Sequence, residues 1–499
     1  MYLNEENFIL NNNFIKYFIN LKSRKVFEFF FEISKIPRES GNETKISEYL
    51  VNFALKRNFF YFVDKSNNTV IKKRATGDLK ESPEIVLQSH ADMVCVKKDN
   101  FDHNFLTDEI KIKINGDFLI SNNTTLGADN GIGVAIMLAI LDSKNISHPK
   151  LECIFTAQEE VSMIGARNFD MSLINGQTFI NLDGTDNYIG CGCVGTSIIS
   201  LSKKYNLIKN NFNSLYILKI NGLYGGHSAV DIDKNRANAI ILTADLLSEL
   251  LEKKDFLIID INSGLKENVI PSSCSIKITF DKKDYLDIYK IISDFKNKIK
   301  KSYVDSESIN ITVSEIDTKT ENYGIDKKYL NDILKLIFIL PNGVINNNLI
   351  SGKIGKYDSS NIAVFETDPK NKKISINCMM RSSNKYYHDF NLNKFRIISD
   401  VLGFKIDILS ETPIWEPNDN KSKLLNCAKK IYREIYNQKA KIRFSSGALE
   451  SCFFKTINNL EIISIGPNII DMHSINEKVS IKSIEKFYLF LIGILDNLT

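Results

Sequence analysis

The chain has 499 residues, of which 43% are apolar, and this length suggests two or three globular domains. Its 64 Lys and Arg residues against 60 Asp and Glu leave a net charge of +4, which is too small to indicate a nucleic-acid partner. The longest apolar runs are about half the roughly 20 residues of a membrane span, and the first residues do not resemble a secretory signal, so we expect a cytoplasmic protein with no membrane partner.

Helical and strand-like patterns alternate through the first part of the chain. Two helices are predicted between Lys25 and Leu55, on either side of a proline-containing break. Strands follow at 60–63, 69–71, 85–88, 151–156 and 178–182. An apolar, glycine-led helix is predicted at 131–141. This alternation is typical of an α/β sandwich.

The pattern changes after residue 197. A helix at 235–252, strands at 256–261 and 275–281, and a helix at 285–301 indicate a separate α+β module. A helix at 421–436, a strand at 460–465 and a helix at 480–498 then return the chain to the first domain. We therefore predict a first domain formed by residues 1–197 and 411–499, and an inserted domain formed by residues 198–410.

A histidine and an aspartate follow the strand predicted at 85–88, in the motif LQSHADMV. Side chains alternate along an extended chain, so His90 and Asp92 project to the same side. There a carboxylate can hold one nitrogen of an imidazole while the other nitrogen binds a metal ion. For such a pair taken alone, a histidine satisfied by solvent or by the core is the more common explanation.

Asp129 lies in TTLGADNGIGVA, between two glycine-bearing turns and just before the apolar helix. A tight loop at a helix N-terminus would present its carboxylate to a ligand. Because Asp and Asn are preferred helix caps, capping is the more common role for this position taken alone.

Two adjacent glutamates, Glu159 and Glu160, follow a strand in FTAQEEVSMIGA. Adjacent carboxylates in a closed site repel each other unless a cation neutralises them. One glutamate could then bind the cation while its neighbour transfers protons. A solvated pair that opens a helix is the simpler alternative.

Two further candidates complete a set. Asp183 ends a strand in FINLDGTD, and His473 lies in the loop MHSINEKV after another strand, in a chain with six histidines. Loops at strand ends are where α/β sheets bind ligands. Two histidines and three carboxylates in such loops fit the ligand preference of zinc, so the whole set predicts a metal site that no single motif establishes.

These motifs, in this order, resemble those of the aminoacyl-histidine dipeptidases (Xaa-His dipeptidases, peptidase D), within the clan of two-zinc aminopeptidases, carboxypeptidases and aminoacylases. The resemblance begins at Lys25, covers nearly all of the chain after it, and also includes KIPRESGNETKISEYL, GGHSAVDI and ENVIP. It implies a zinc-peptidase-type α/β/α sandwich as the catalytic domain, with the α+β module of residues 198–410 as a lid.

The resemblance also implies the metal ligands, with zinc as the metal and manganese or cobalt as alternatives. The five ligands would be His90, Asp129, Glu160, Asp183 and His473. Asp129 would bridge two ions. His90 and Asp183 would complete one ion, and Glu160 and His473 would complete the other.

The remaining catalytic roles follow from the same resemblance. Glu159 would be the general base that takes a proton from the attacking water, and Asp92 would hold His90 from behind. Members of the clan often have a cis peptide bond after the bridging aspartate, here Asp129–Asn130. In the lid, His227 would stabilise the oxyanion.

Asn268 and Arg381 in the lid would bind the substrate's backbone and its terminal carboxylate, for which the planar fork of arginine is suited. For His227, a turn histidine after two glycines is the alternative. The chain also departs from the family pattern. Ser446, in SSGALESC, stands at or next to the place of a typical histidine, and Ala91 and Cys95 replace the usual Met and Pro.

The predicted reaction is hydrolysis of a dipeptide, with a small peptide as the partner and a homodimer as the expected assembly. A broader dipeptidase or tripeptidase, or a deacylase acting on N-acylated amino acids, shares every predicted ligand and stays open. A non-catalytic metal-binding protein is a further alternative. It would most simply lack Glu159 or a ligand, and all of these residues are present.

Overall fold

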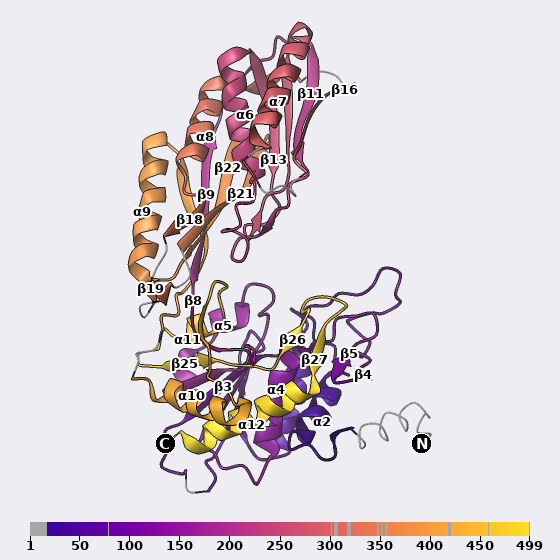
Figure 1. The fold of residues 1–499 in the computed structure, drawn as a ribbon, viewed down its shortest axis with the longest axis vertical. Coiled ribbons are helices and arrows are strands. Elements are labelled where there is room, and N and C mark those ends of the chain that lie inside the picture. The colour runs from indigo at the N-terminus through magenta and orange to yellow at the C-terminus, as the bar shows by residue number, and fades with distance from the viewer. Residues whose placement is uncertain are drawn as a thin grey trace. The chain divides into compact units, whose positions relative to one another are not determined.

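The computed structural model describes residues 17–77, 79–300, 302–303, 308–316, 321–346, 349–350, 353–354, 358–417, 421–457 and 459–498. The chain forms two compact units (Figure 1). Unit 1 runs to Gly192 and resumes at 415–445 and from Leu449 onward, whereas unit 2 comprises 193–414 and 446–448. The division lies within five residues of the predicted boundaries at 197/198 and 410/411. It also assigns the short segment 446–448 to unit 2.

Unit 1 is built on an eight-stranded sheet. In spatial order its strands are β1 (Phe60–Val63), β2 (Thr69–Lys73), β6 (Leu151–Thr156), β3 (Ile85–His90), β7 (Thr178–Asn181), β25 (Glu461–Ser464), β8 (Ile189–Cys193) and β24 (Ile442–Ser445). Strand β3 is parallel to β6 and β7, and β25 is parallel to β7. The carboxyl ends of these four strands therefore lie at one edge of the sheet.

Helices pack on both faces of this sheet. The larger core joins the sheet to α2 (Arg24–Ile33), α3 (Thr44–Leu55), α4 (Ala128–Asp142), α10 (Lys423–Tyr436) and α12 (Ile481–Asn497). On β7, Ile180 faces this core, whereas its neighbour Phe179 contacts Phe454 of α11 (Ser451–Phe454), with 4.7 Å between ring centroids. The predicted α/β/α sandwich is confirmed. Among the described residues, no helix is both long and apolar enough to cross a bilayer.

A second, smaller sheet belongs to the same unit and was not predicted. Its strands are β26 (Ile469–Ile470), β27 (Lys478–Ser480), β5 (Phe118–Ile120) and β4 (Lys113–Asn115). Strands β26 and β27 pair antiparallel, so the segment between them forms a closed loop. This loop carries His473.

Unit 2 is a large antiparallel sheet with four helices that share one core with it. The main strand order is β16 (Asn310–Ile316), β11 (Ser214–Asn221), β15 (Cys274–Phe280), β13 (Phe256–Ser263), β21 (Asp358–Asp368), β22 (Lys373–Ser382), β9 (Gly195–Lys204) and β23 (Lys405–Thr412). The helices are α6 (Ala239–Lys253), α7 (Tyr285–Ile299), α8 (Lys327–Ile339) and α9 (Lys385–Leu402). Unit 2 has the predicted α+β character. The helices α8 and α9 and the long strands β21 and β22 were not predicted from the sequence.

Candidate active site

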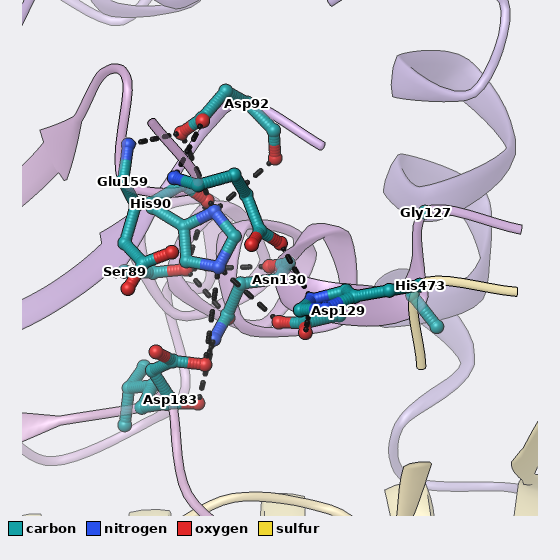
Figure 2. A network of polar contacts seen from close by, with 12 residues as sticks. Ser89, His90, Asp92, Gly127, Asp129, Asn130, Glu159, Asp183 and His473 are labelled. Atoms are coloured by element: carbon teal, nitrogen blue, oxygen red, sulfur yellow. Dashed lines mark hydrogen bonds and ion pairs between the residues drawn. The ribbon is translucent and has the colours of Figure 1, made fainter. Parts of the chain in front are cut away.

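The five predicted metal ligands come together at the carboxyl edge of the unit 1 sheet. His90 ends β3, Glu160 follows β6, Asp183 follows β7, and His473 lies in the loop between β26 and β27. Asp129 lies in the first turn of α4. Figure 2 shows four of them, His90, Asp129, Asp183 and His473, with Asp129 beside His473 and within reach of His90.

Two ligand groups share the carboxylate of Asp129. In the first, Nε2 of His90 lies 3.2 Å from Oδ1 of Asp129 and 3.9 Å from Oδ1 of Asp183. In the second, Nε2 of His473 lies 3.2 Å from Oδ2 of Asp129 and 3.0 Å from Oε1 of Glu160. The two oxygens of one carboxylate thus face different groups, which is the arrangement that a ligand bridging two cations requires.

The local backbone excludes the simpler alternatives for two motifs. Asp129 and Asn130 have non-helical φ/ψ inside α4, and the peptide bond between them is cis, as the resemblance implied. The two carboxylate oxygens of Asp129 contact Nε2 of His90 and Nε2 of His473. Helix α5 (Ile164–Asn168) begins four residues after Glu160 and has Met163 as its N-cap. Asp129 is therefore not a cap, and the glutamate pair does not open a helix.

The chemistry of the donor set fits divalent cations. Oε1 of Glu160 is buried and lies 3.0 Å from Nε2 of His473. Two ligand atoms that each lie 2.0–2.2 Å from one tetrahedral zinc ion are about 3.4 Å apart. The ligand atoms within the two groups here are separated by 3.0 to 3.9 Å, which is close to that value. Burial and the neighbouring charge of Asp129 raise the pKa of Asp183 to about 6. Bound cations would relieve this repulsion.

Asp92 fixes the position of three other site residues. Its Oδ1 lies 3.4 Å from Nδ1 of His90, which leaves Nε2 of His90 directed at the metal ligands. The same carboxylate accepts hydrogen bonds from the backbone amides of Glu159 at 3.1 Å and Glu160 at 3.3 Å, and from Oγ of Ser40 at 2.7 Å. Burial opposes its charge, but the contact with His90 outweighs this and lowers the pKa of Asp92.

Glu159 lies beside the ligands without joining either group that contains Asp129. It approaches His90 and Glu160, and burial raises its pKa well above the usual range, with the charge of Asp183 adding to the effect. A buried carboxylate with an elevated proton affinity is suited to accept and return a proton.

The three lid candidates come together within unit 2. His227 ends β12 (Gly226–His227), which pairs with β14 (Val269–Ile270), and the carbonyl of Asn268 accepts the amide of Ser228 at 2.8 Å. Nη2 of Arg381 donates to Oγ of Ser228 at 3.3 Å. Nδ1 of His227 accepts the amide of Ala229, which leaves Nε2 as the protonated nitrogen of the neutral ring.

Arg381 also contacts the short segment 446–448 of unit 2. Nη1 of Arg381 donates to the carbonyl of Ser446 at 3.4 Å. The guanidinium is buried, and burial lowers its pKa to about 10. Its Nε has no hydrogen-bond partner in the part of the chain that the structure describes. A buried guanidinium with an unused donor is suited to bind a carboxylate.

Three buried charged residues near the site were not predicted. Glu477 accepts hydrogen bonds from the amides of the turn that carries Asp129, and Arg38 donates to the carbonyls of Ala91 and Asp92. Oε2 of Glu450 accepts hydrogen bonds from Gln88 and Thr156 beneath the ligands, and burial raises its pKa to about 8. Each of these side chains forms hydrogen bonds to residues that are distant from it in sequence. All three lie in quoted motifs, Glu477 in MHSINEKV, Arg38 in KIPRESGNETKISEYL and Glu450 in SSGALESC, but none was singled out.

Metal binding is expected to displace protons. Hydrogen bonds to Asp129 and Glu160 raise the pKa of His473 to about 10 in the metal-free protein, so its ring is protonated at pH 7. A cation can bind Nε2 only after this proton leaves. We expect zinc binding at pH 7 to release at least one proton per chain, and affinity to fall as the pH is lowered from 8 to 6. Calorimetric titrations in buffers of different ionisation enthalpy measure this release, and equal heats in all buffers would contradict it.

Comparison with known proteins places this geometry in a family. The family model described as Peptidase family M20/M25/M40 matches residues 86–497. The chain belongs to this peptidase family. The M20 match includes all five predicted ligands, and the family resemblance inferred from the motifs is confirmed.

Relatives of this M20 peptidase match it over nearly its whole length. The cytosol non-specific dipeptidase of Escherichia coli (strain K12) is 29% identical over 486 residues, which cover 96% of this chain and 98% of the relative. The crystal structure of an aminoacylhistidine dipeptidase from Vibrio alginolyticus is similar with a TM-score of 0.83 at 26% identity, covering 98% of this chain and 99% of that one. A tripeptidase from Staphylococcus aureus has a TM-score of 0.53 at 16% identity and shows the fold alone.

Proposed function

We propose that this M20 peptidase hydrolyses dipeptides, with Xaa-His dipeptides as preferred substrates, at two zinc ions. The observation that carries the proposal is the pair of ligand groups that share Asp129, one completed by His90 and Asp183 and the other by Glu160 and His473. Two relatives that match nearly the full chain are named as dipeptidases, which supports the substrate class.

The residues of unit 1 have separate roles in the proposed reaction. His90, Asp129, Glu160, Asp183 and His473 would hold divalent ions, which would supply polarisation of the scissile carbonyl and a lowered pKa of the attacking water. Glu159 takes the proton of that water and returns it to the leaving amine. Asp92 keeps the ring of His90 and the backbone of Glu159 in place for these steps.

We propose that unit 2 supplies the groups that recognise the substrate. The protonated Nε2 of His227 donates to the oxyanion, Asn268 binds the peptide backbone, and Arg381 binds the terminal carboxylate. The support for Arg381 is its burial together with its unused Nε.

Removing the guanidinium tests this assignment. We expect Arg381→Met to lower kcat/KM for a dipeptide about 10- to 200-fold, because a hydrogen-bonded charge pair contributes roughly 1.5–3 kcal/mol. A C-terminally amidated dipeptide should be a poor substrate for both proteins and show little further loss. Equal losses on the free and amidated dipeptides would show that Arg381 does not bind the carboxylate.

A broader substrate range is the second candidate. The E. coli relative is named a non-specific dipeptidase, and Ser446 stands at or next to the typical histidine of the Xaa-His dipeptidases. A panel of Xaa-His dipeptides, other dipeptides, tripeptides and N-acylated amino acids, assayed with zinc, manganese or cobalt, separates the candidates. Preference for Xaa-His with zinc supports the first proposal. Equal rates on all dipeptides support the second, and cleavage of acylated amino acids alone would contradict both.

We also propose a cytoplasmic homodimer that forms through unit 2. The E. coli relative is named for the cytosol. Four exposed apolar residues follow one face of α9 at helical spacing: Tyr386, Phe390, Ile397 and Val401. Strand β23 ends the main strand path of the sheet and exposes Leu409. Unpaired sheet edges favour pairing with another chain.

Charge on this face should dissociate the dimer. We expect Ile397→Asp combined with Val401→Asp to convert the protein to a monomer in light scattering after gel filtration. Leu286→Asp, at an equally exposed apolar position on α7, is the matched control and should remain dimeric. A wild-type monomer would contradict the proposal.

A further inference from the structure

Glu477 joins two of the three parts of the chain that carry the ligands of one proposed ion, the turn of Asp129 and the loop of His473. Its Oε2 accepts hydrogen bonds from the amides of Leu126 at 2.7 Å and Gly127 at 3.0 Å. Its Oε1 accepts hydrogen bonds from the amides of Ala128 at 2.8 Å and Asp129 at 3.1 Å. One buried carboxylate thus satisfies four successive backbone donors at the start of α4.

These donors have no local alternative. The amides of Leu126 and Gly127 precede α4, and those of Ala128 and Asp129 lie in its first turn, where amides lack partners within the helix. A carboxylate at this end also interacts favourably with the helix dipole. The carboxylate of Glu477 therefore fixes the conformation of the turn that carries Asp129.

The other end of this connection is the loop of His473. Glu477 lies four residues after His473, and its amide donates to the carbonyl of Ser474 at 3.1 Å. Strand β27 begins at the next residue and pairs with both β26 and β5. The loop is thus anchored at its base, and the Glu477 side chain ties it to the turn of Asp129.

Arg38 balances the buried charge and extends the connection. Its Nη2 donates to the carbonyl of Gly127 at 2.5 Å, and its Nη1 donates to the carbonyls of Ala91 and Asp92 at 3.0 Å. The guanidinium therefore lies against the same turn that Glu477 holds from its amide side. A side chain on Gly127 would collide with it, since an added Cβ would lie 2.6 Å from Nη2 of Arg38.

We infer that Glu477 is a positioning residue for the metal ion held by Asp129, Glu160 and His473. This inference rests on the proposed two-metal site. Both ions share Asp129, and Asp183 of the other ion accepts a hydrogen bond at 2.6 Å from Nδ2 of Asn130, the next residue of the same turn, whereas His90 ends β3. Only the ion at His473 also depends on the loop that Glu477 ties to this turn. Loss of Glu477 should therefore weaken one ion more than the other.

Zinc titration of Glu477→Gln tests the inference. In the variant, the NH2 group of the glutamine replaces one carboxylate oxygen, so this donor would face backbone N–H donors of the turn. The conformation of the turn should then no longer be fixed. We expect wild type to bind two zinc ions per chain. In the variant both ions should bind more weakly, because both use Asp129, and the ion at His473 should lose at least tenfold more affinity than the other. In a His473→Ala background, which already lacks that ion, Glu477→Gln should lower the remaining affinity only as much as it lowers the affinity of the less affected ion in the protein that keeps His473.

Glu461→Gln is the matched control, because Glu461 also caps a helix from a distance. It accepts hydrogen bonds from Oγ of Ser422 and the amide of Leu424 at the start of α10. This variant should lose stability and keep both zinc affinities. If Glu477→Gln does not fold, Glu477→Asp keeps the charge with a shorter reach and should show the same unequal loss, larger for the ion at His473.

The outcomes separate the inference from the proposed function. Unchanged affinity for both ions in a folded Glu477 variant, or an equal loss of both, would overturn the inference and leave the two-metal site intact. A wild-type protein that binds fewer than two zinc ions would overturn the proposed function, and the inference with it.

Discussion

Glu159→Ala is expected to lower kcat by about a hundredfold to ten-thousandfold, the range over which a positioned acid or base contributes. Glu159 lies beside the ligands but outside both groups that share Asp129. Its loss therefore removes the proton acceptor while the ligand atoms of both proposed ions remain. Steady-state kinetics on a dipeptide and zinc analysis of the same sample measure the two effects.

The zinc content distinguishes loss of chemistry from loss of the site. Glu159→Ala should retain two zinc ions per chain, and Glu48→Ala, which removes an exposed carboxylate from α3, should behave as wild type. Activity of Glu159→Ala within a few fold of wild type would show that another group is the base. Loss of zinc would show that Glu159 is a ligand.

Asp129→Asn is expected to have the broadest effect, because it removes the negative charge from the carboxylate that both ligand groups share. Both zinc affinities should fall at least a hundredfold, and turnover should become undetectable at ordinary zinc concentrations. Coordination by a carboxylate places a negative charge beside each cation, which an amide oxygen does not supply. Equilibrium dialysis with zinc measures the loss.

Asp183→Asn is the comparison for this prediction. Asp183 approaches only His90 and Asp129 in the first group, so its loss should weaken one ion and spare the ion at His473. If Asp129→Asn also weakened a single ion, the carboxylate would not be a bridge.

The predicted site follows from the parallel strands of unit 1. Because β3, β6, β7 and β25 run in one direction, residues that come just after them in sequence meet at one edge. His90, Glu160 and Asp183 could therefore be grouped before any coordinates were known. The pairing of ligands into two groups came from the family resemblance, and the distances at Asp129 agree with it.

The residues that hold the ligands could not be predicted in this way. Glu477 meets Asp129 across 348 positions of sequence, and Glu450 meets Gln88 across 362. Their partners are backbone amides and buried polar side chains, which leave no spacing pattern in either segment. Capping was the alternative for Asp129 taken alone, and in the structure it is Glu477 that accepts the amides of this turn.

The unpredicted part of unit 2 has a similar cause. Helix α9 buries Asn391 and Ser399 together with Leu392 and Phe395, so its buried face is not an apolar stripe. Strand β21 begins with the buried polar residues of DSSN, which read as a loop in sequence. Contacts with the rest of unit 2, rather than a hydrophobic pattern in their own sequence, therefore determine that these segments form a helix and a strand.

Metal analysis combined with chelation tests the central claim most directly. The purified chain should contain two divalent ions, lose dipeptide hydrolysis when a chelator removes them, and recover it when zinc is restored. Full dipeptidase activity in the chelated, metal-free protein would contradict the account.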